Sequence, residues 1–197
     1  MSNLFQKLEY EAFRAGITPR TKESMTWFRN RVKNMRTVNR KKLMSDEPTT
    51  FTSRISPGNM YHFYYDPKHK ETLPYYDRFP LIIAVGPAKG GFYGLNLHYL
   101  PPNLRAKLLD ALMDLASDNK FNDRTKLKLS YKMLKDASRY RWFKPCFKHY
   151  LTKHVRSRFS RVPAPEWEIA VFLRTAQFEK ATQGKVYADS KRIIAGK

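Results

Sequence analysis

Three apolar runs punctuated by glycine and proline occupy the middle of the chain, at residues 60–65, 79–85 and 92–99. The first run ends at an Asp-Pro pair, and Gly-Pro and Gly-Gly pairs separate the second run from the third. Glycine and proline in such places favour turns over continued strands. The pattern therefore predicts a small antiparallel sheet or an SH3-like partial barrel over about residues 59–99.

Helical periodicity surrounds this predicted sheet. Leucine and alanine at positions 104, 108, 111, 112 and 115 form one apolar stripe directly after two prolines, which predicts a helix there. The N-terminal segment carries a similar stripe, and Gly16 is expected to end that helix in the left-handed conformation. A second helix is predicted to begin at Thr18-Pro19 and to continue through basic residues as far as Lys42.

The pattern near the C-terminus predicts one more strand and one more helix. Apolar side chains alternate with others from Trp167 to Arg174, which is typical of a strand. The last residues predict a short helix or an arm with a basic end.

These elements together predict an α+β fold in which helices surround a small sheet. We divide the chain into a basic helical region (1–44), a linker rich in Pro, Thr and Ser (45–58), and an α+β core whose C-terminal part is basic and aromatic (59–197).

Composition adds a strong positive charge to this picture. The 197 residues include 38 Lys and Arg against 17 Asp and Glu, a net charge of +21, while 42% hydrophobic residues suffice for a folded core. Such a surplus is costly unless a polyanion offsets it. Nucleic acid is the first candidate partner, an acidic protein the second and an anionic membrane the third. The membrane is disfavoured because no apolar run reaches the roughly 18 residues that a spanning helix needs.

The charge is concentrated in two tracts without any acidic residue, 25–44 and 137–165. Clustered cations neutralise phosphates, which provides most of the affinity of proteins for DNA. The predicted DNA-binding residues are Arg29, Arg31, Lys33, Arg36, Arg40, Lys41, Lys42, Arg139, Arg141, Lys144, Lys148, Lys153, Arg156, Arg158 and Arg161.

Aromatic residues are interleaved with the cations of the second tract. They are Tyr140, Trp142, Phe143, Phe147, Tyr150 and Phe159. Flat rings beside cations are typical of proteins that stack on the bases of single strands. The helical spacing of Trp142, Phe143 and Phe147 favours the alternative that these rings belong to the core, which we prefer.

Carboxylates and histidines in the central segment raise the alternative of a metal-dependent nuclease. They are Asp66, Glu71, Asp77, His62, His69 and His98. A nuclease needs two or three carboxylates converging on Mg²⁺. Asp66 precedes a proline in a predicted turn and Asp77 begins a predicted strand, so chance clustering or turn capping is the preferred interpretation. We predict no catalytic residue, no metal and no cofactor.

The single cysteine, Cys146, excludes an internal disulfide and a cysteine-rich zinc site. Cys146 and His149 form an i, i+3 pair on a predicted helix, which would suit a nucleophile and its base. A small buried residue is the preferred interpretation of this lone cysteine.

Four stretches resemble a known family. They are FYYDPKHKETLPYYDRFPLIIAV, GFYGLNLHYLPPNLRAKLLDAL, KPCFKHYLTKHVRSRF and VYADSKRI, which together cover roughly residues 58–192. The chain resembles the DNA end protectors of T-even-type phages, also called head-completion proteins.

The resemblance implies a non-catalytic virion protein that binds double-stranded DNA ends and shields them from host exonuclease. It also implies contacts with portal, neck or other head proteins, and a place in the head or neck and later in the host cytoplasm. Two alternatives stay open: a structural head, neck or baseplate protein that binds an acidic partner, and the nuclease. General RNA binding is also compatible with the charge.

Overall fold

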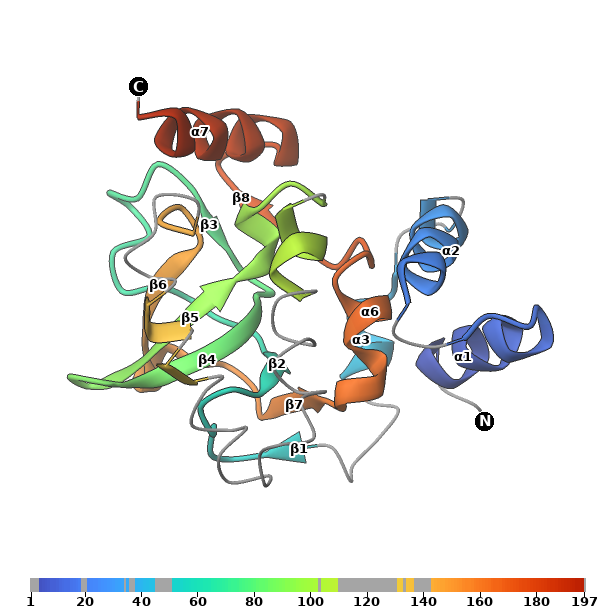
Figure 1. The fold of residues 1–197 in the computed structure, drawn as a ribbon. Coiled ribbons are helices and arrows are strands. Elements are labelled where there is room, and N and C mark those ends of the chain that lie inside the picture. Colours follow the sequence, from blue (N-terminus) through green and yellow to red (C-terminus); the bar gives the residue numbers. More distant parts are fainter. Residues whose placement is uncertain are drawn as a thin grey trace.

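The computed structural model describes residues 4–18, 21–33, 35, 38–44, 51–102, 104–109, 131–132, 134–136 and 143–196. At its centre lies an antiparallel six-stranded sheet with the strand order β1-β7-β2-β4-β5-β6 (Figure 1). The strands are β1 (Phe51–Thr52), β2 (Met60–His62), β4 (Leu81–Ala88), β5 (Gly91–Asn96), β6 (Phe147–Leu151) and β7 (Phe159–Val162). Among the described strands no pairing joins β1 to β6, so the sheet is open.

This sheet confirms the predicted α+β class and enlarges the predicted sheet. β2 lies within the first apolar run, and β4 and β5 overlap the second and third runs, although β4 continues through Gly86 and Pro87 to Ala88. β1 comes from the predicted linker, and β6 and β7 come from the second basic tract. A separate two-stranded ladder joins β3 (Tyr76–Asp77) to β8 (Phe178–Glu179).

Both faces of the central strands are buried. Consecutive residues of a strand point to opposite faces of the sheet, and consecutive residues of these strands lie in two different core clusters. On one face, Met60 and Leu81 belong to a core cluster that extends to the helices. On the other face, Tyr61 and Ile82 belong to a cluster dominated by aromatic rings. An irregularity in the β4–β5 pairing lies between Ala84 and Gly86. Bulges of this kind increase the local twist of a sheet.

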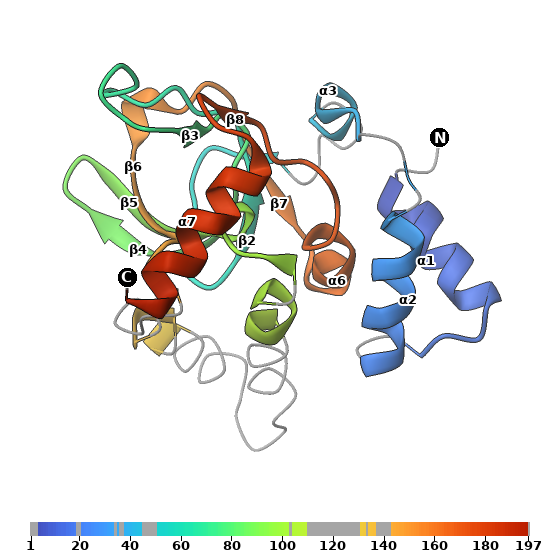
Figure 2. The same ribbon diagram turned by 90° about the horizontal axis from the view of Figure 1, so that it is seen from above.

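The helices gather in two places beside the sheet (Figures 1 and 2). α1 (Leu4–Arg14) packs on α2 (Lys22–Lys33), and α2 packs on α6 (Trp167–Ala170) at one side. α7 (Gln183–Ala195) lies apart from them and packs against the 3₁₀ turn η2 (Leu97–Tyr99). The remaining short elements are α3 (Arg40–Leu43), η3 (Thr152–His154) and η4 (Ala164–Glu166). None of the described helices is long and apolar enough to cross a membrane.

Several helix predictions are confirmed. α1 forms where its apolar stripe predicts it, and Gly16 follows with a positive φ of 70°. Residues 104–109 are helical after the two prolines, and the rest of that predicted helix lies outside the described residues. The last residues were predicted to form either a helix or an arm, and they form the helix α7. This helix is capped by Thr182 and is followed by Gly196 in the left-handed conformation.

The predicted limits of the second N-terminal helix are wrong. α2 begins at Lys22 because Thr21 and Ser24 cap it reciprocally, each backbone N–H donating to the other residue's hydroxyl at 3.0 Å. The helix ends at Lys33, and Arg40, Lys41 and Lys42 belong to the separate helix α3.

The late strand predicted from Trp167 to Arg174 is also wrong. Residues 167–170 form α6, and Ile169, Ala170 and Val171 are buried in succession, which a strand with one solvated face would not allow. The indole N–H of Trp167 donates to the carbonyl of Val162 at 2.9 Å and fixes the start of this helix.

Candidate nucleic-acid interface

Four predicted DNA-binding residues form an exposed group that we call the basic edge: Lys153, Arg156, Arg158 and Arg161. Lys153 lies in η3 next to the edge strand β6, Arg161 lies in β7, and the other two lie between these elements. Arg156 is 3.7 Å from the partly exposed carboxylate of Asp66. No ion pair joins the other three cations to a described carboxylate, so their charge faces solvent.

Two other predicted residues have partners within the protein. Arg31 forms an ion pair with Glu11 of α1 at 2.7 Å. Arg40 donates hydrogen bonds to the carbonyls of Thr175 and Ala176 at 2.7 and 2.6 Å, which attaches α3 to the chain before β8. Arg40 therefore has a structural role in addition to any contact with DNA.

Lys148 is likewise directed inward. Its ammonium lies 4.0 Å from the centre of the Tyr99 ring, a cation–π contact, and burial lowers the pKa of Lys148. Lys41 and Lys144 are exposed. The remaining predicted residues, Arg36, Arg139 and Arg141 and the side chains of Lys33 and Lys42, lie outside the described part.

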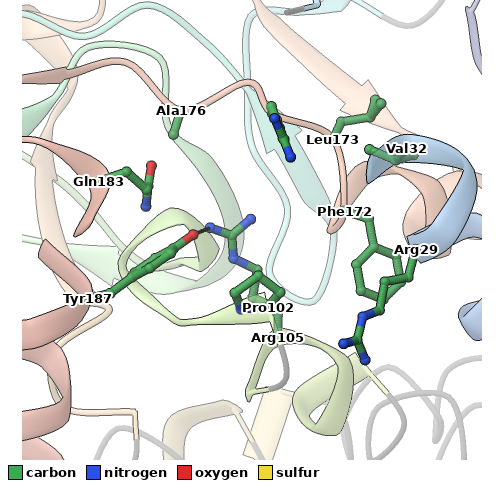
Figure 3. A pocket seen from close by; sticks show the side chains of 10 residues that line it. Arg29, Val32, Pro102, Arg105, Phe172, Leu173, Ala176, Gln183 and Tyr187 are labelled. Carbon is green, nitrogen blue, oxygen red and sulfur yellow. Dashed lines mark hydrogen bonds between the residues drawn. The ribbon is translucent and has the colours of Figure 1, made fainter. Parts of the chain in front are cut away.

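A cleft of 690 Å³ lies where α2 meets the core, and three arginines line it (Figure 3). Arg29 comes from α2, Arg105 from the helical segment 104–109, and Arg174 from the connection between α6 and β8. Among the described residues no Asp or Glu lines the cleft. Its other lining residues are Val32, Pro102, Phe172, Leu173, Ala176, Gln183 and Tyr187. We call this site the arginine cleft.

Only one of these three arginines was among the predicted residues. Arg29 lies in an acid-free tract, whereas Arg105 and Arg174 lie outside both tracts. One signal for Arg105 was present in the sequence: it lies three and four positions before Leu108 and Leu109, on the buried face of the same helix.

Arg105 is buried, with only 4% of its surface exposed, and hydrogen bonds hold its side chain in place. Its guanidinium donates to the carbonyls of Leu100 (2.8 Å), Val171 (3.0 Å) and His98 (3.3 Å) and to the hydroxyl of Tyr187 (2.6 Å). These acceptors are neutral, and no described carboxylate lies within 4.0 Å of Arg105. Burial lowers the pKa of Arg105, although an arginine remains charged in a protein.

A buried polar network lies deeper in the core, around Asp77 and His98. The carboxylate Oδ2 of Asp77 is 2.6 Å from His98 Nδ1 and accepts from the Asn96 side chain at 3.1 Å. Its Oδ1 accepts the backbone N–H groups of Phe79 and Gln177 at 3.0 and 3.1 Å.

The pKa values indicate the charge state of this pair. Burial opposes the ionisation of Asp77, but its attraction to His98 and the hydrogen bonds around it outweigh burial, so its pKa lies below the ordinary value. Burial lowers the pKa of His98 more strongly than Asp77 raises it. A neutral His98 that donates Nδ1–H to an ionised Asp77 agrees with both directions.

His98 Nε2 is 3.0 Å from the hydroxyl of Thr175, so hydroxyl, imidazole and carboxylate stand in the order of a nucleophilic triad. Thr175 and His98 are both 0% exposed, and Asp77 is 4% exposed. A substrate cannot reach the hydroxyl in this arrangement. The network therefore ties β3, η2 and the chain before β8 together.

The acidic residues weighed for a nuclease do not converge. Asp66 pairs with Lys70 at 3.2 Å, Asp77 is buried with His98, and Glu71 is exposed. Within the described ranges no group of three or more His, Cys, Asp or Glu side chains could hold a metal ion.

The cysteine–histidine pair is not on a helix, because Phe147 begins strand β6. Cys146 is fully buried and its thiol donates to the carbonyl of Phe143 at 3.0 Å. Burial raises the pKa of Cys146 to about 12, so the reactive thiolate is not populated at neutral pH. His149 is exposed. These positions confirm the preferred interpretation of a small buried residue.

The described aromatic residues of the second tract point into the protein. Tyr150 and Phe159 are buried in the aromatic cluster, and Phe147 stacks on Tyr93 with ring centres 5.0 Å apart. Phe143 packs against the main core. The core interpretation is thus confirmed for Phe143 and Phe147, whereas Tyr140 and Trp142 lie outside the described residues.

Comparison with known proteins identifies the family. The family model described as phage T4 terminal DNA protecting protein matches residues 1–195. No curated protein and no solved structure gives a significant match. Because the match spans almost the whole chain, including both basic tracts, this phage protein belongs to the family of T4-type terminal DNA protecting proteins.

Proposed function

We propose that the protein binds the ends of linear double-stranded phage DNA and shields them from exonuclease by occupying them, without cutting the DNA. The observation that carries this proposal is the family match over residues 1–195. An exonuclease must engage a free terminus, so a protein that stays bound there blocks degradation without any chemistry of its own.

The distribution of charge supports this mode of action. Lys153 of the basic edge lies in η3, which directly follows β6, whereas the arginine cleft includes α2. β6 and α2 lie at opposite sides of the sheet in both views (Figures 1 and 2). Cations on two sides can neutralise phosphates of both strands near a terminus. The net charge of +21 then becomes favourable on the polyanion.

Completion of the head is the second part of the proposal. A protein held on the terminus of packaged DNA would sit where the head closes, close to portal or neck proteins. Cations that do not contact DNA would suit acidic surfaces of such proteins.

The proposal is tested by an exonuclease protection assay. Purified protein is mixed with linear duplex and a matched closed circle, with and without Mg²⁺, before a processive exonuclease is added. We expect the linear DNA to survive, and the circle, which has no end, to be neither bound preferentially nor cut.

Two results would contradict the proposal. Cleavage of the circle by the protein alone would establish a nuclease. Rapid degradation of the linear DNA at saturating protein would leave a structural role toward an acidic partner protein.

A further inference from the structure

The arginine cleft has the dimensions and chemistry of a ligand site. Its 690 Å³ lies within the range of about 300–1,000 Å³ typical of small-ligand pockets, and a single phosphate would leave most of it empty. Cationic side chains and the rings of Phe172 and Tyr187 line the same space (Figure 3). This combination suits a ligand that carries both a charged phosphate and a flat or apolar group, as a nucleotide does.

Arg105 gives the cleft a fixed positive charge. Four hydrogen bonds to neutral acceptors hold its guanidinium, and no described carboxylate within 4.0 Å neutralises it. The ionised Asp77 attracts Arg105 only from beyond 4.0 Å, so the burial of this charge is costly and a bound anion would offset part of that cost. The exposed Arg29 and Arg174 form no ion pair with a described residue and are therefore available to the same anion.

A DNA end differs from the interior of a duplex in one charged group. An internal phosphodiester carries one negative charge, whereas a terminal phosphomonoester carries about −1.5 to −2 at pH 7 and has three acceptor oxygens. Arginine pairs with such a group through two parallel hydrogen bonds. Several arginines around one site can therefore bind a terminal phosphomonoester more tightly than an internal phosphodiester, which distinguishes an end from a continuous strand.

We propose that the arginine cleft binds the terminal nucleotide of a DNA end and recognises its terminal phosphomonoester through hydrogen bonds from Arg29 and Arg174, next to the buried charge of Arg105. This inference rests on the proposed function and specifies how it selects ends. Arg105 presents a rigid charge at the floor, and Arg29 and Arg174 complete the contacts from α2 and from the chain before β8.

The test uses DNA hairpins with one open end and a fluorophore in the closed loop. The open end carries a 5′-phosphate, a 3′-phosphate or hydroxyls only, and binding is measured by anisotropy with closed circular DNA as competitor. We expect one phosphorylated end to bind about tenfold more tightly than the hydroxyl end, the effect of one charge-assisted hydrogen bond. The 5′ and 3′ arms identify which strand supplies the phosphate.

The variants Arg29→Gln and Arg174→Gln should abolish most of this preference. Both side chains are exposed, so the melting temperature of each variant should match that of the wild type. Arg158→Gln, at the basic edge, is the matched comparison: it should weaken binding to every hairpin by a similar factor and leave the ratio between ends unchanged.

Two outcomes separate the inference from the proposed function. If the protein prefers hairpin ends to the circle but binds phosphate and hydroxyl ends equally, the inference is wrong and end binding stands. If it prefers no end to the circle, the proposed function itself fails.

Discussion

His62 is a buried histidine, and no hydrogen bond of good geometry joins its ring nitrogens to a described residue. It stacks on Phe79 with ring centres 4.9 Å apart, and its ring centre is 6.2 Å from that of His98. Burial, and secondly repulsion from His98 when that residue is protonated, lowers the pKa of His62 to about 3 from the ordinary 6.5. These effects outweigh the opposite effects of Asp77 and the Pro80 backbone. The folded protein therefore holds this ring neutral over a pH range in which the unfolded chain would protonate it.

We expect His62→Phe to reduce the sensitivity of the protein to acid. Between pH 6.5 and about 3 the unfolded state binds a proton at His62 that the folded state does not, so the free energy of unfolding falls as the pH falls. Removing this group should reduce the slope of the free energy of unfolding against pH by up to about 1.4 kcal/mol per pH unit in this range. Urea unfolding at a series of pH values measures it.

The control is His69→Gln, which removes an exposed histidine instead of a buried one. Asp77 and His98 are present in both variants, so the comparison isolates the loss of His62 together with its electrostatic coupling to these two residues. Equal slopes for His62→Phe and the wild type would show that His62 is not held neutral in the folded state.

At the scale of the secondary-structure element, the pairing of β5 with β6 depends on a close approach between the backbones of the two strands. A Cβ atom at Gly91 would lie 1.8 Å from the carbonyl oxygen of Tyr150 in the neighbouring strand. The strands can pair in this register, with Gly91 opposite Leu151, only because residue 91 has no side chain.

Gly91→Ala should therefore lower the free energy of unfolding by about 3 kcal/mol or more, because the clash involves backbone that cannot move without breaking the ladder. Gly184→Ala is the matched control. Its Cβ would have its nearest neighbour at 4.0 Å within α7, so it should raise the stability by about 0.5 kcal/mol. Urea unfolding of both variants measures the difference, and similar stabilities would contradict the proximity argument.

At the scale of the whole molecule, the position of positive charge matters in addition to its total. The basic edge, the arginine cleft and the exposed face of α7 all carry cations. Only the first two contain residues that we place against DNA, so charge reversals that change the net charge equally should differ in effect.

The double variant Arg156→Glu and Arg158→Glu should weaken binding to linear DNA and flatten its salt dependence. Each lost phosphate contact reduces the slope of log K against log salt by about 0.9, so a reduction of about 2 is expected. Titrations over a range of salt concentrations measure the slope. The control, Lys191→Glu with Arg192→Glu on α7, changes the net charge equally and should retain most of the slope. Identical losses in both variants would mean that only the net charge matters.

Much of the local structure could be predicted from the sequence. The stripe of α1, the glycine that ends it and the central apolar runs each specify an element through contacts between near neighbours. The boundaries of the helices were less well predicted. Thr18 and Pro19 suggested the start of the second helix, but Thr21 and Ser24 cap it three residues later.

The candidate site was predicted only in part. The acid-free tracts identified Arg29 and the basic edge, because a run of like charges is visible in one dimension. Arg105 and Arg174 gave no such signal, and Arg40 and Lys148 were expected to face DNA but have partners within the protein. Pairing between residues distant in the chain decides these roles.

By itself, the sequence determined the α+β class, the family resemblance and a charge that calls for a polyanion. Only the tertiary structure decided that part of the second basic tract becomes β6 and β7, that its described rings enter the core, and that three separate arginines meet in one cleft. The physical reason is the distance along the chain over which each effect acts. Periodicity and turn chemistry act over a few residues, whereas strand pairing and the burial of charge depend on partners supplied by distant segments.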